Sequence, residues 1–352
     1  MRVLIRVPNW VGDAVMALPA LRELRRIFAD ARITLAAQPY LAGLLEGEGL
    51  ADDLITVPNS KGVVQPATHF LTTARKLRKE RFDFAVLLQN AFGAAFLARA
   101  GGARRIAGYP TDSRRALLHL PVEFQPDYRT SHQVFYYLNI AAAVERDVAG
   151  VSRVDFDNAQ PRLTAGDEDR KQARMILGRA DETLLSPATR ILVINPGATN
   201  SRAKQWLPDR FAAAADRLGD ADGFRTVIVG TPGDIAVANE TASHMRSRAS
   251  VLAGETTLPA LKGLLSLSSL VISNDTGAAH VSSALGVPTV VVFGPTEHVS
   301  TRPYSDSASV VRRDVECSPC MLRDCPIDHR CMTGVEVEDV YRAAKQLLVN
   351  AG

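Results

Sequence analysis

The stretch LVISNDTGAAHVSSALGVPTVVVF, residues 270–293, contains two apolar runs separated by a polar loop and a helical segment. The runs Leu270–Ser273 and Thr289–Phe293 are rich in Val and Ile and predict β-strands. The segment Thr276–Leu285 between them predicts a helix. Apolar runs that are continuous rather than alternating are typical of parallel strands covered on both faces. The stretch therefore predicts a β-α-β unit of a parallel sheet.

The same alternation extends through the rest of the chain. Further strands are predicted over Val3–Val7, Arg32–Ala36, Leu54–Val57, Phe84–Leu88, Arg105–Gly108, Arg190–Asn195 and Thr226–Val229. Helical patterns lie between them, and the first, Asp13–Phe28, contains Pro19, which predicts a break or kink. Two successive series of β-α-β units predict an α/β fold with two Rossmann-like, doubly wound domains.

A polar segment separates the two series. Residues 155–169, DFDNAQPRLTAGDED, carry little apolar sequence, and we place the linker near them. We expect one domain over residues 1–165 and a second over residues 186–335. Apolar residues at helical spacing in the last segment, 336–352, predict a C-terminal helix.

The composition is typical of a globular protein, since 46% of the 352 residues are hydrophobic and 22% are charged. This excludes disordered and collagen-like chains. The net charge of +3 does not indicate a nucleic-acid-binding protein. Residues 1–165 hold 21 Lys and Arg against 16 Asp and Glu, whereas residues 166–352 hold 20 against 22. Most cations of the first half are Arg, so its excess suits either an anionic partner or a plain solvated surface.

The N-terminal sequence MRVLIRVPNW lacks the pattern of a signal peptide, because its apolar run is short and contains Arg6. No segment reaches the roughly 18 apolar residues of a membrane-spanning helix. We therefore expect a cytoplasmic protein.

The cysteines form one cluster near the end of the chain, and this excludes a secreted disulfide framework. They are Cys317, Cys320, Cys325 and Cys331, with His329 beside them. A CxxC pair with two further cysteines indicates either a small zinc site or structural, disulfide-prone thiols.

Ligands of open α/β sheets bind beyond the C-terminal ends of the strands, so the loops that follow strands are expected to carry the chemistry. The first such loop, VPNWVGD over residues 7–13, ends in Asp13 at the start of a helix. Asp is a common helix cap, but a carboxylate at this edge is also available as a general base. No GxGxxG motif follows a predicted strand, which argues against a dinucleotide-dependent enzyme.

Two loops of the second half combine small residues with hydroxyl groups and a charge. The loop PGATNSRAKQW, residues 196–206, contains Thr199 and Lys204. Backbone amides, hydroxyls and an ammonium group together suit phosphate oxygens, and we predict phosphate contact rather than a plain polar loop. The loop GTPGD, residues 230–234, ends in Asp234, which either binds a ribose hydroxyl or caps the next helix.

The loop SNDTGAAH, residues 273–280, is the most informative. It places Asp275, Thr276 and Gly277 at a helix N-terminus, where unpaired amides and the positive end of the helix dipole favour a diphosphate. His280 lies one turn into the helix on the same face as Thr276, and would hydrogen-bond the diphosphate or support the loop.

Four motifs in combination resemble glycosyltransferase family 9. They are RVPNWVGDAVMALPAL (6–21), NPGATNSRAKQWLPDRFA (195–212), SNDTGAAHVSSALGVPTVVVFGPT (273–296) and CSPCMLRDCPIDHRCM (317–332). They are spread over essentially the whole chain. The resemblance implies a GT-B architecture, in which two Rossmann-like domains face a cleft and the helix at 336–352 returns toward the first domain.

The resemblance also implies an activity, the transfer of L-glycero-D-manno-heptose from ADP-heptose to the heptose-Kdo2-lipid A inner core of lipopolysaccharide. The implied reaction is a single inverting displacement without a metal or another cofactor. Asp13 would be the base, and Lys204 would stabilise the departing ADP. The motifs assign donor contacts to Thr199, Asn200, Asp234, Asp275, Thr276, Gly277 and His280. Asn200 departs from a family pattern of two adjacent threonines, and Asp234 aligns only loosely.

The implied acceptor is anionic, and the Arg-rich first half would face it. The candidates by charge and loop position are Arg104, Arg105, Arg114 and Arg115. Peripheral contact with the cytosolic face of the inner membrane is expected, and a nucleic-acid partner is not. The alternatives are a family member with another acceptor, a GT-B nucleotide-sugar epimerase, and a non-catalytic ADP-sugar sensor.

Overall fold

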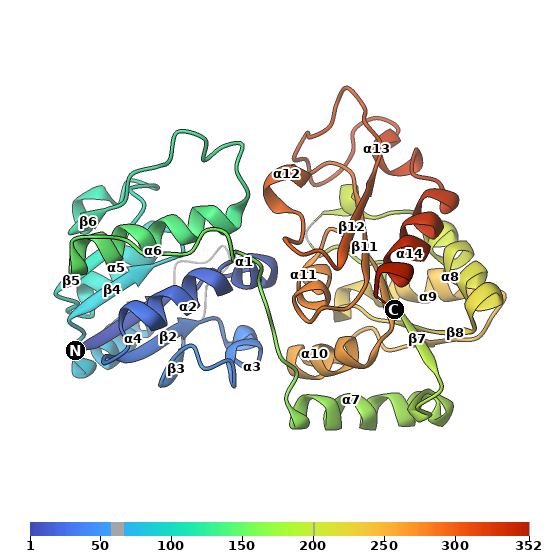
Figure 1. The fold of residues 1–352 in the computed structure, drawn as a ribbon, viewed down its shortest axis with the longest axis horizontal. Helices are drawn as coiled ribbons and strands as arrows, with labels where there is room; N and C mark the ends of the chain where they lie inside the picture. Colours follow the sequence, from blue (N-terminus) through green and yellow to red (C-terminus); the bar gives the residue numbers. More distant parts are fainter. Residues whose placement is uncertain (58–66, 200, 352) are drawn as a thin grey trace. The chain divides into compact units, whose positions relative to one another are not determined.

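The computed structural model describes residues 1–57, 67–199 and 201–351 of the chain. The chain divides into two compact units, Met1–Pro161 and Arg162–Gly352. Each unit contains a parallel six-stranded sheet with helices packed on it (Figure 1). The α/β fold with two Rossmann-like domains is therefore confirmed.

The first unit has the strand order β3-β2-β1-β4-β5-β6, and every neighbouring pair is parallel. Its strands are β1 (Arg2–Arg6), β2 (Arg32–Ala37), β3 (Asp53–Thr56), β4 (Phe84–Leu87), β5 (Arg105–Gly108) and β6 (Leu120–Pro121). Its helices are α1 (Val11–Met16), α2 (Leu18–Ile27), α3 (Ala42–Leu45), α4 (Ala67–Glu80), α5 (Phe92–Ala100) and α6 (Gln133–Ala149).

The order of the strands decides which helices share a face of this sheet. From β1 to β2 the chain crosses toward the β3 edge of the sheet. From β3 to β4, and from β4 to β5, it crosses toward the opposite, β6 edge. Because such crossovers are right-handed, α2 covers one face and α4 and α5 cover the other. In agreement, α2 packs against α6, and α4 packs against α5.

The second unit repeats the design with the order β12-β11-β10-β7-β8-β9, again with parallel pairs. Its strands are β7 (Arg190–Asn195), β8 (Phe224–Ile228), β9 (Ala249–Val251), β10 (Leu270–Asn274), β11 (Thr289–Phe293) and β12 (Ala308–Arg312). Its helices are α7 (Asp167–Ala180), α8 (Pro208–Asp222), α9 (Ile235–His244), α10 (Leu258–Leu267), α11 (Gly277–Ala284), α12 (His298–Thr301), α13 (Arg330–Thr333) and α14 (Val337–Ala351).

The core of the second unit lies between its sheet and the helices α8 and α14. Trp206 is fully buried there, and its ring packs edge-on against Phe211 with the centroids 4.9 Å apart. The last helix contributes Val340, Ala344 and Leu347 to the same core. The predicted C-terminal helix is thus packed against its own unit, and its return toward the first domain stays a prediction.

The predicted break at Pro19 is confirmed. The helical pattern Asp13–Phe28 forms two helices, because α1 ends at Met16 and α2 begins at Leu18. Pro19 sits in the first turn of α2, where its missing N–H removes no helical hydrogen bond. Among the described residues, no helix combines the length and the hydrophobicity that crossing a bilayer requires.

Candidate active site

The loop that follows β1 carries Asp13 in the first turn of α1, at the C-terminal edge of the first sheet. The hydroxyl of Tyr137, from α6, donates a hydrogen bond to Asp13 Oδ1 over 3.2 Å. Burial, with the negative charge of Asp13 as a second cause, raises the pKa of Tyr137 well above its ordinary value. Tyr137 therefore stays protonated and holds the carboxylate through a permanent donor.

A buried guanidinium supports the same loop. Arg6, at the end of β1, donates to the carbonyl oxygens of Val7 and Ala36 at 3.0 and 2.9 Å and to Asn9 Oδ1 at 2.7 Å. Burial lowers the pKa of Arg6 to about 10, so the group is still charged at neutral pH. Gln38 also donates to Asn9 Oδ1, at 3.1 Å. In the sequence, the role of Arg6 in holding this loop is indicated only by its charge at the end of an otherwise apolar strand.

Three loops of the second unit meet around Asp275, beyond the adjacent strands β7, β10 and β11. Lys204 forms an ion pair with Asp275 Oδ2 at 2.7 Å, and the hydroxyl of Thr296 donates to the same oxygen at 2.7 Å. Asp275 is buried, and the Lys204 side chain is about one-quarter exposed. The ammonium group is thus held at the C-terminal edge of the sheet, where a ligand can reach it.

The loops after β7 and β10 are joined by polar side chains. Asn274 accepts from the backbone N–H of Trp206 at 2.9 Å and donates to the carbonyl of Pro196 at 2.8 Å. Asn195 donates to the hydroxyl of Thr276 at 2.9 Å. Within the described chain the Thr276 side chain makes no capping bond to α11, so the first amides of this helix, from Gly277 on, are suited to an anion.

Asp234 is the N-cap residue of α9, but its side chain makes no capping bond to that helix and instead closes the 3-10 turn Pro232–Asp234 that precedes it. Its Oδ2 accepts from both the backbone N–H and the hydroxyl of Thr231, at 2.8 and 2.6 Å, and the side chain is buried. A Cβ added to Gly197 would lie only 2.2 Å from Asp234 Cγ, so glycine is needed for the loop after β7 to pass this carboxylate. Thr199 lies nearby, with its hydroxyl 3.5 Å from that of Thr231. Asn200 lies outside the described residues.

His280 is buried one turn into α11. Burial lowers its pKa to about 4, while Asp275 acts to raise it and Lys204 to lower it further. The imidazole is therefore neutral at pH 7 and lies within electrostatic range of the Lys204–Asp275 pair. The predicted residues Lys204, Asp275, Thr276, Gly277 and His280 thus gather at one edge of the second sheet.

The four predicted acceptor arginines do not share one place. Arg104 directly precedes β5 and Arg105 is its first residue, so both lie at the edge of the first sheet opposite to Asp13. There they pair with Asp83 at 3.2 Å and with Asp147 at 2.6 Å. This position does not favour contact with the acceptor, because ligands of such sheets bind at the other edge.

The position of Arg114 does not favour acceptor contact either. It is fully buried, and its guanidinium donates to the carbonyl of Tyr109 at 2.8 Å and to Asn90 Oδ1 at 3.0 Å, as well as to the carbonyl of Gln89. It joins the loops after β4 and β5 and offers no free charge to an acceptor. Arg115 is exposed and follows the C-terminal end of β5, so it stays a predicted acceptor contact.

The family model for glycosyltransferase family 9 (heptosyltransferase) matches residues 70–330 of the chain. The chain belongs to this family. It is 28% identical to lipooligosaccharide heptosyltransferase 2 of Campylobacter jejuni, covering 100% of this chain and 99% of the relative. It is also 28% identical to lipopolysaccharide heptosyltransferase 2 of Escherichia coli K12, covering 89% and 88%.

Solved structures of the family share the fold. The ADP-heptose lipopolysaccharide heptosyltransferase II of Escherichia coli superposes with a TM-score of 0.82 at 23% identity, over 100% of this chain and 99% of that one. A family 9 glycosyltransferase from Veillonella parvula superposes with a TM-score of 0.85 at 24% identity, over 99% and 97%. The GT-B-type pair of Rossmann-like units is therefore the fold of this glycosyltransferase.

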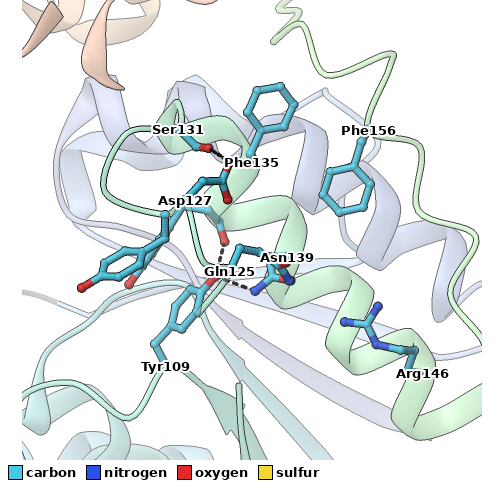
Figure 2. Close-up of a pocket in the computed structure, with 10 residues that line it drawn as sticks. Tyr109, Gln125, Asp127, Ser131, Phe135, Asn139, Arg146 and Phe156 are labelled. Carbon is cyan, nitrogen blue, oxygen red and sulfur yellow. Dashed lines mark hydrogen bonds between the residues drawn. The ribbon is translucent and has the colours of Figure 1, made fainter. Parts of the chain in front are cut away.

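A further feature of this family 9 chain lacks any sequence motif. A cavity of about 510 Å³ lies beside α6 in the first unit, and Figure 2 shows the residues that line it. Aromatic rings of Tyr109, Phe135 and Phe156 lie beside the amides of Gln125 and Asn139. Gln125 donates to Asn139 Oδ1 at 2.7 Å, and Asn139 donates to the hydroxyl of Tyr109 at 2.9 Å. The lining is thus a mixture of aromatic rings and polar or charged side chains.

The cysteine-rich segment supports the turn that presents Lys204. The carbonyl oxygen of Ala203 lies 2.6 Å from His329 Nε2. The backbone N–H of Ala203 donates to the carbonyl of Arg323 at 2.9 Å. All four cysteines are free thiols, and burial raises the pKa of Cys331. Among the described residues, no three His, Cys, Asp or Glu side chains come together as a metal-binding set.

Proposed function

We propose that this family 9 enzyme is an ADP-heptose:lipopolysaccharide heptosyltransferase II. It would transfer L-glycero-D-manno-heptose from ADP-heptose to the heptose of heptose-Kdo2-lipid A. The observation that carries the proposal is the similarity to heptosyltransferase 2 relatives over essentially the whole chain. The charged cluster of Lys204 and Asp275 at the C-terminal edge of the second sheet supports it.

The proposed reaction is a single displacement with inversion. Asp13 accepts the proton of the acceptor hydroxyl while that oxygen bonds to the anomeric carbon of the donor, and the bond from this carbon to ADP breaks. Base assistance of this kind contributes about 10²–10⁴-fold to the rate. Tyr137 and the loop held by Arg6 support this role, because they fix the position of the carboxylate.

The departing ADP gains negative charge, and the second unit offers two ways to stabilise it. The ammonium of Lys204 is oriented by Asp275 and reaches the ligand edge of the sheet. The N-terminal amides of α11 add the positive end of a helix dipole. Thr199 and Thr276 supply hydroxyls on the neighbouring loops, while the neutral imidazole of His280 supports α11 from within.

We place the reaction at the cytosolic face of the inner membrane, with ADP-heptose as the soluble donor and a phosphorylated Kdo-lipid A as the acceptor. The excess of Arg in residues 1–165 supports an anionic acceptor on the first unit. Arg115 is the remaining arginine of the predicted acceptor set that lies on the ligand edge.

Product analysis with defined acceptors tests the proposal. The full chain is mixed with ADP-heptose and either heptose-Kdo2-lipid A or heptose-free Kdo2-lipid A, and products are identified by mass spectrometry. We expect addition of one heptose to the first acceptor and release of one ADP per transfer. Transfer to the heptose-free acceptor indicates heptosyltransferase I instead. Epimerisation without acceptor, or binding without turnover, would overturn the proposal.

A further inference from the structure

Two helices of the first unit present an exposed surface that the reaction does not use. We call it the α4–α5 face and define it by Leu71, Arg75 and Arg78 on α4 and by Phe92, Phe96 and Arg99 on α5. Leu71, Phe92 and Phe96 are 47%, 43% and 45% exposed. Large apolar side chains that gather on a surface mark an interaction site more often than scattered ones do.

The sequence spacing forms one stripe on each helix. Leu71, Arg75 and Arg78 are four and three residues apart, and so are Phe92, Phe96 and Arg99, which places each set on one side of its helix. In both stripes the apolar residues come first and the arginine side chains follow. Both helices run opposite to the parallel strands, so their apolar ends lie at the C-terminal edge of the sheet, the edge that also carries Asp13.

Aromatic stacking fixes the two stripes side by side. The rings of Phe70 and Phe96 stack with their centroids 5.1 Å apart, and those of Phe92 and Phe96 with 5.9 Å. One ring from α4 and two from α5 therefore form a continuous stack. The apolar half of the face is thus formed in advance, with little side-chain freedom left to lose on binding.

The cationic half of the face is not neutralised. Its positive charges are Arg75, Arg78 and Arg99, and the exposed Lys76 and Lys79 of α4 lie next to it. None of these five forms an ion pair with another described residue, whereas the nearby Glu80 is paired with Arg2. Cations at the ends of helices also complement the helix dipole, but that role does not require exposed phenyl rings beside them.

We propose that the α4–α5 face docks the protein on an anionic lipid bilayer. The phenyl rings and Leu71 enter the boundary between headgroups and acyl chains, and the five cations contact lipid phosphates. The charge of the face selects this partner over a neutral surface. The inference rests on the proposed function only in that the acceptor named there is a membrane lipid. Docking at the edge that carries Asp13 would bring the acceptor sugars to the base.

Vesicle flotation of the full chain tests the docking. Vesicles of phosphatidylcholine alone are compared with vesicles containing 30% phosphatidylglycerol, at low and high salt. We expect binding to the anionic vesicles that weakens with salt. The double variant Arg75→Glu/Arg99→Glu should bind at least about 25-fold more weakly, from about fivefold per lost cation. The double variant Leu71→Ser/Phe92→Ser should lose about tenfold.

Matched controls come from the same unit. Arg153→Glu and Phe156→Ser change an exposed cation and a 40% exposed ring away from the face, and both should bind as the wild type does. Thermal unfolding identifies any variant that fails to fold, and the charge variants alter no buried group. The proposal is overturned if the wild type ignores anionic vesicles, if both face variants bind normally, or if the face instead mediates a dimer that these variants dissociate.

Activity with two forms of the acceptor separates docking from chemistry. On a deacylated, water-soluble acceptor the face variants should transfer heptose as fast as the wild type. On the acceptor embedded in anionic vesicles they should be at least tenfold slower. Equal rates in vesicles overturn the docking. If the wild type transfers heptose to neither acceptor, the proposed function fails, and flotation still decides the docking independently.

Discussion

Each proposed catalytic residue is held by a partner far away in the sequence. Asp13 accepts from Tyr137, 124 positions later, and Lys204 pairs with Asp275, 71 positions later. Both contacts are made by the folded chain itself. Such preorganisation is valuable in catalysis, because the groups need no reorientation when charge develops. It also makes the roles of the partners testable by single substitutions.

Replacing Lys204 by Met keeps most of the apolar stem and removes the charge. We expect kcat/KM for ADP-heptose to fall by about 10²–10³-fold, because the departing diphosphate loses its cation. Lys204→Arg should restore part of the activity. Lys171→Met, at an exposed position of α7, is the matched control and should stay within twofold of the wild type. A Lys204→Met enzyme with normal kinetics would remove Lys204 from the mechanism.

Replacing Tyr137 by Phe removes the donor to Asp13 and leaves the ring in place. A hydrogen bond from a hydroxyl stabilises the charged carboxylate, so its loss makes Asp13 easier to protonate. We expect the acid limb of the kcat/KM profile to move to higher pH by about one unit. A merely structural Tyr137 would lower the folding stability and leave the acid limb where it is.

At the scale of elements, α11 combines ligand binding with a buried histidine. Its start faces the ligand edge, and His280, one turn later, is enclosed by the second unit. The pKa of His280 is about 4 in the folded chain, against an ordinary value of 6.5 that applies to the unfolded chain. Between pH 4 and pH 6.5 the unfolded chain therefore binds this proton more readily than the folded chain does. Stability from this residue is therefore complete above about pH 6.5 and is lost as the pH falls toward 4.

This linkage predicts a pH-dependent unfolding free energy. Between pH 7.5 and pH 5 the His280 contribution should fall by about 2 kcal/mol, measured by urea unfolding at both pH values. His280→Asn should be less stable at pH 7.5 and should lack this part of the pH dependence. His244→Asn, which changes an exposed histidine of α9, should keep it. An unchanged pH dependence in His280→Asn would contradict the burial of a neutral imidazole.

Apolar continuity predicts the central strands and the edge strand β3 well, but it does not predict the other three edge strands. The central strands β1, β7, β10 and β11 lie close to their predicted positions. The edge strands β6 and β9 have only two and three residues, and β12 is partly exposed, so their local patterns are too weak to recognise. Pairing within a sheet stabilises such segments, and that information is not local.

The candidate site shows the same limit. Loop position and residue type predict the gathering of Lys204, Asp275 and Thr276, because their loops follow strands. They do not predict that Tyr137 reaches Asp13, nor that Arg114 is buried under a turn in which Asp112 and Ser113 adopt positive φ angles. Such contacts depend on tertiary packing, which a pattern of residue types does not encode locally.

At the scale of the whole molecule, the two units differ in charge and in the chemistry of their ligand edges. The first carries the carboxylate and an excess of Arg, and the second carries helix amides and one ordered ammonium group. The proposed function divides the substrates between the units: it assigns the acceptor to the first unit and the nucleotide to the second.

Hydrogen exchange with ADP tests this division. We expect slower exchange in the loops after β7 and β10 and at the start of α11, since the diphosphate would cover their amides. The loop at residues 7–13 should change much less with ADP alone. Slower exchange confined to the first unit would indicate that ADP binds there, which would contradict the proposed roles of the two units.

The most direct test of the proposed chemistry is the rate of heptosyl transfer by Asp13→Asn compared with the wild type. Asn has nearly the same shape but accepts no proton at neutral pH. We expect transfer from ADP-heptose to heptose-Kdo2-lipid A to slow by about 10²–10⁴-fold, with the dissociation constant for ADP-heptose unchanged. Transfer within twofold of the wild-type rate would contradict Asp13 as the base.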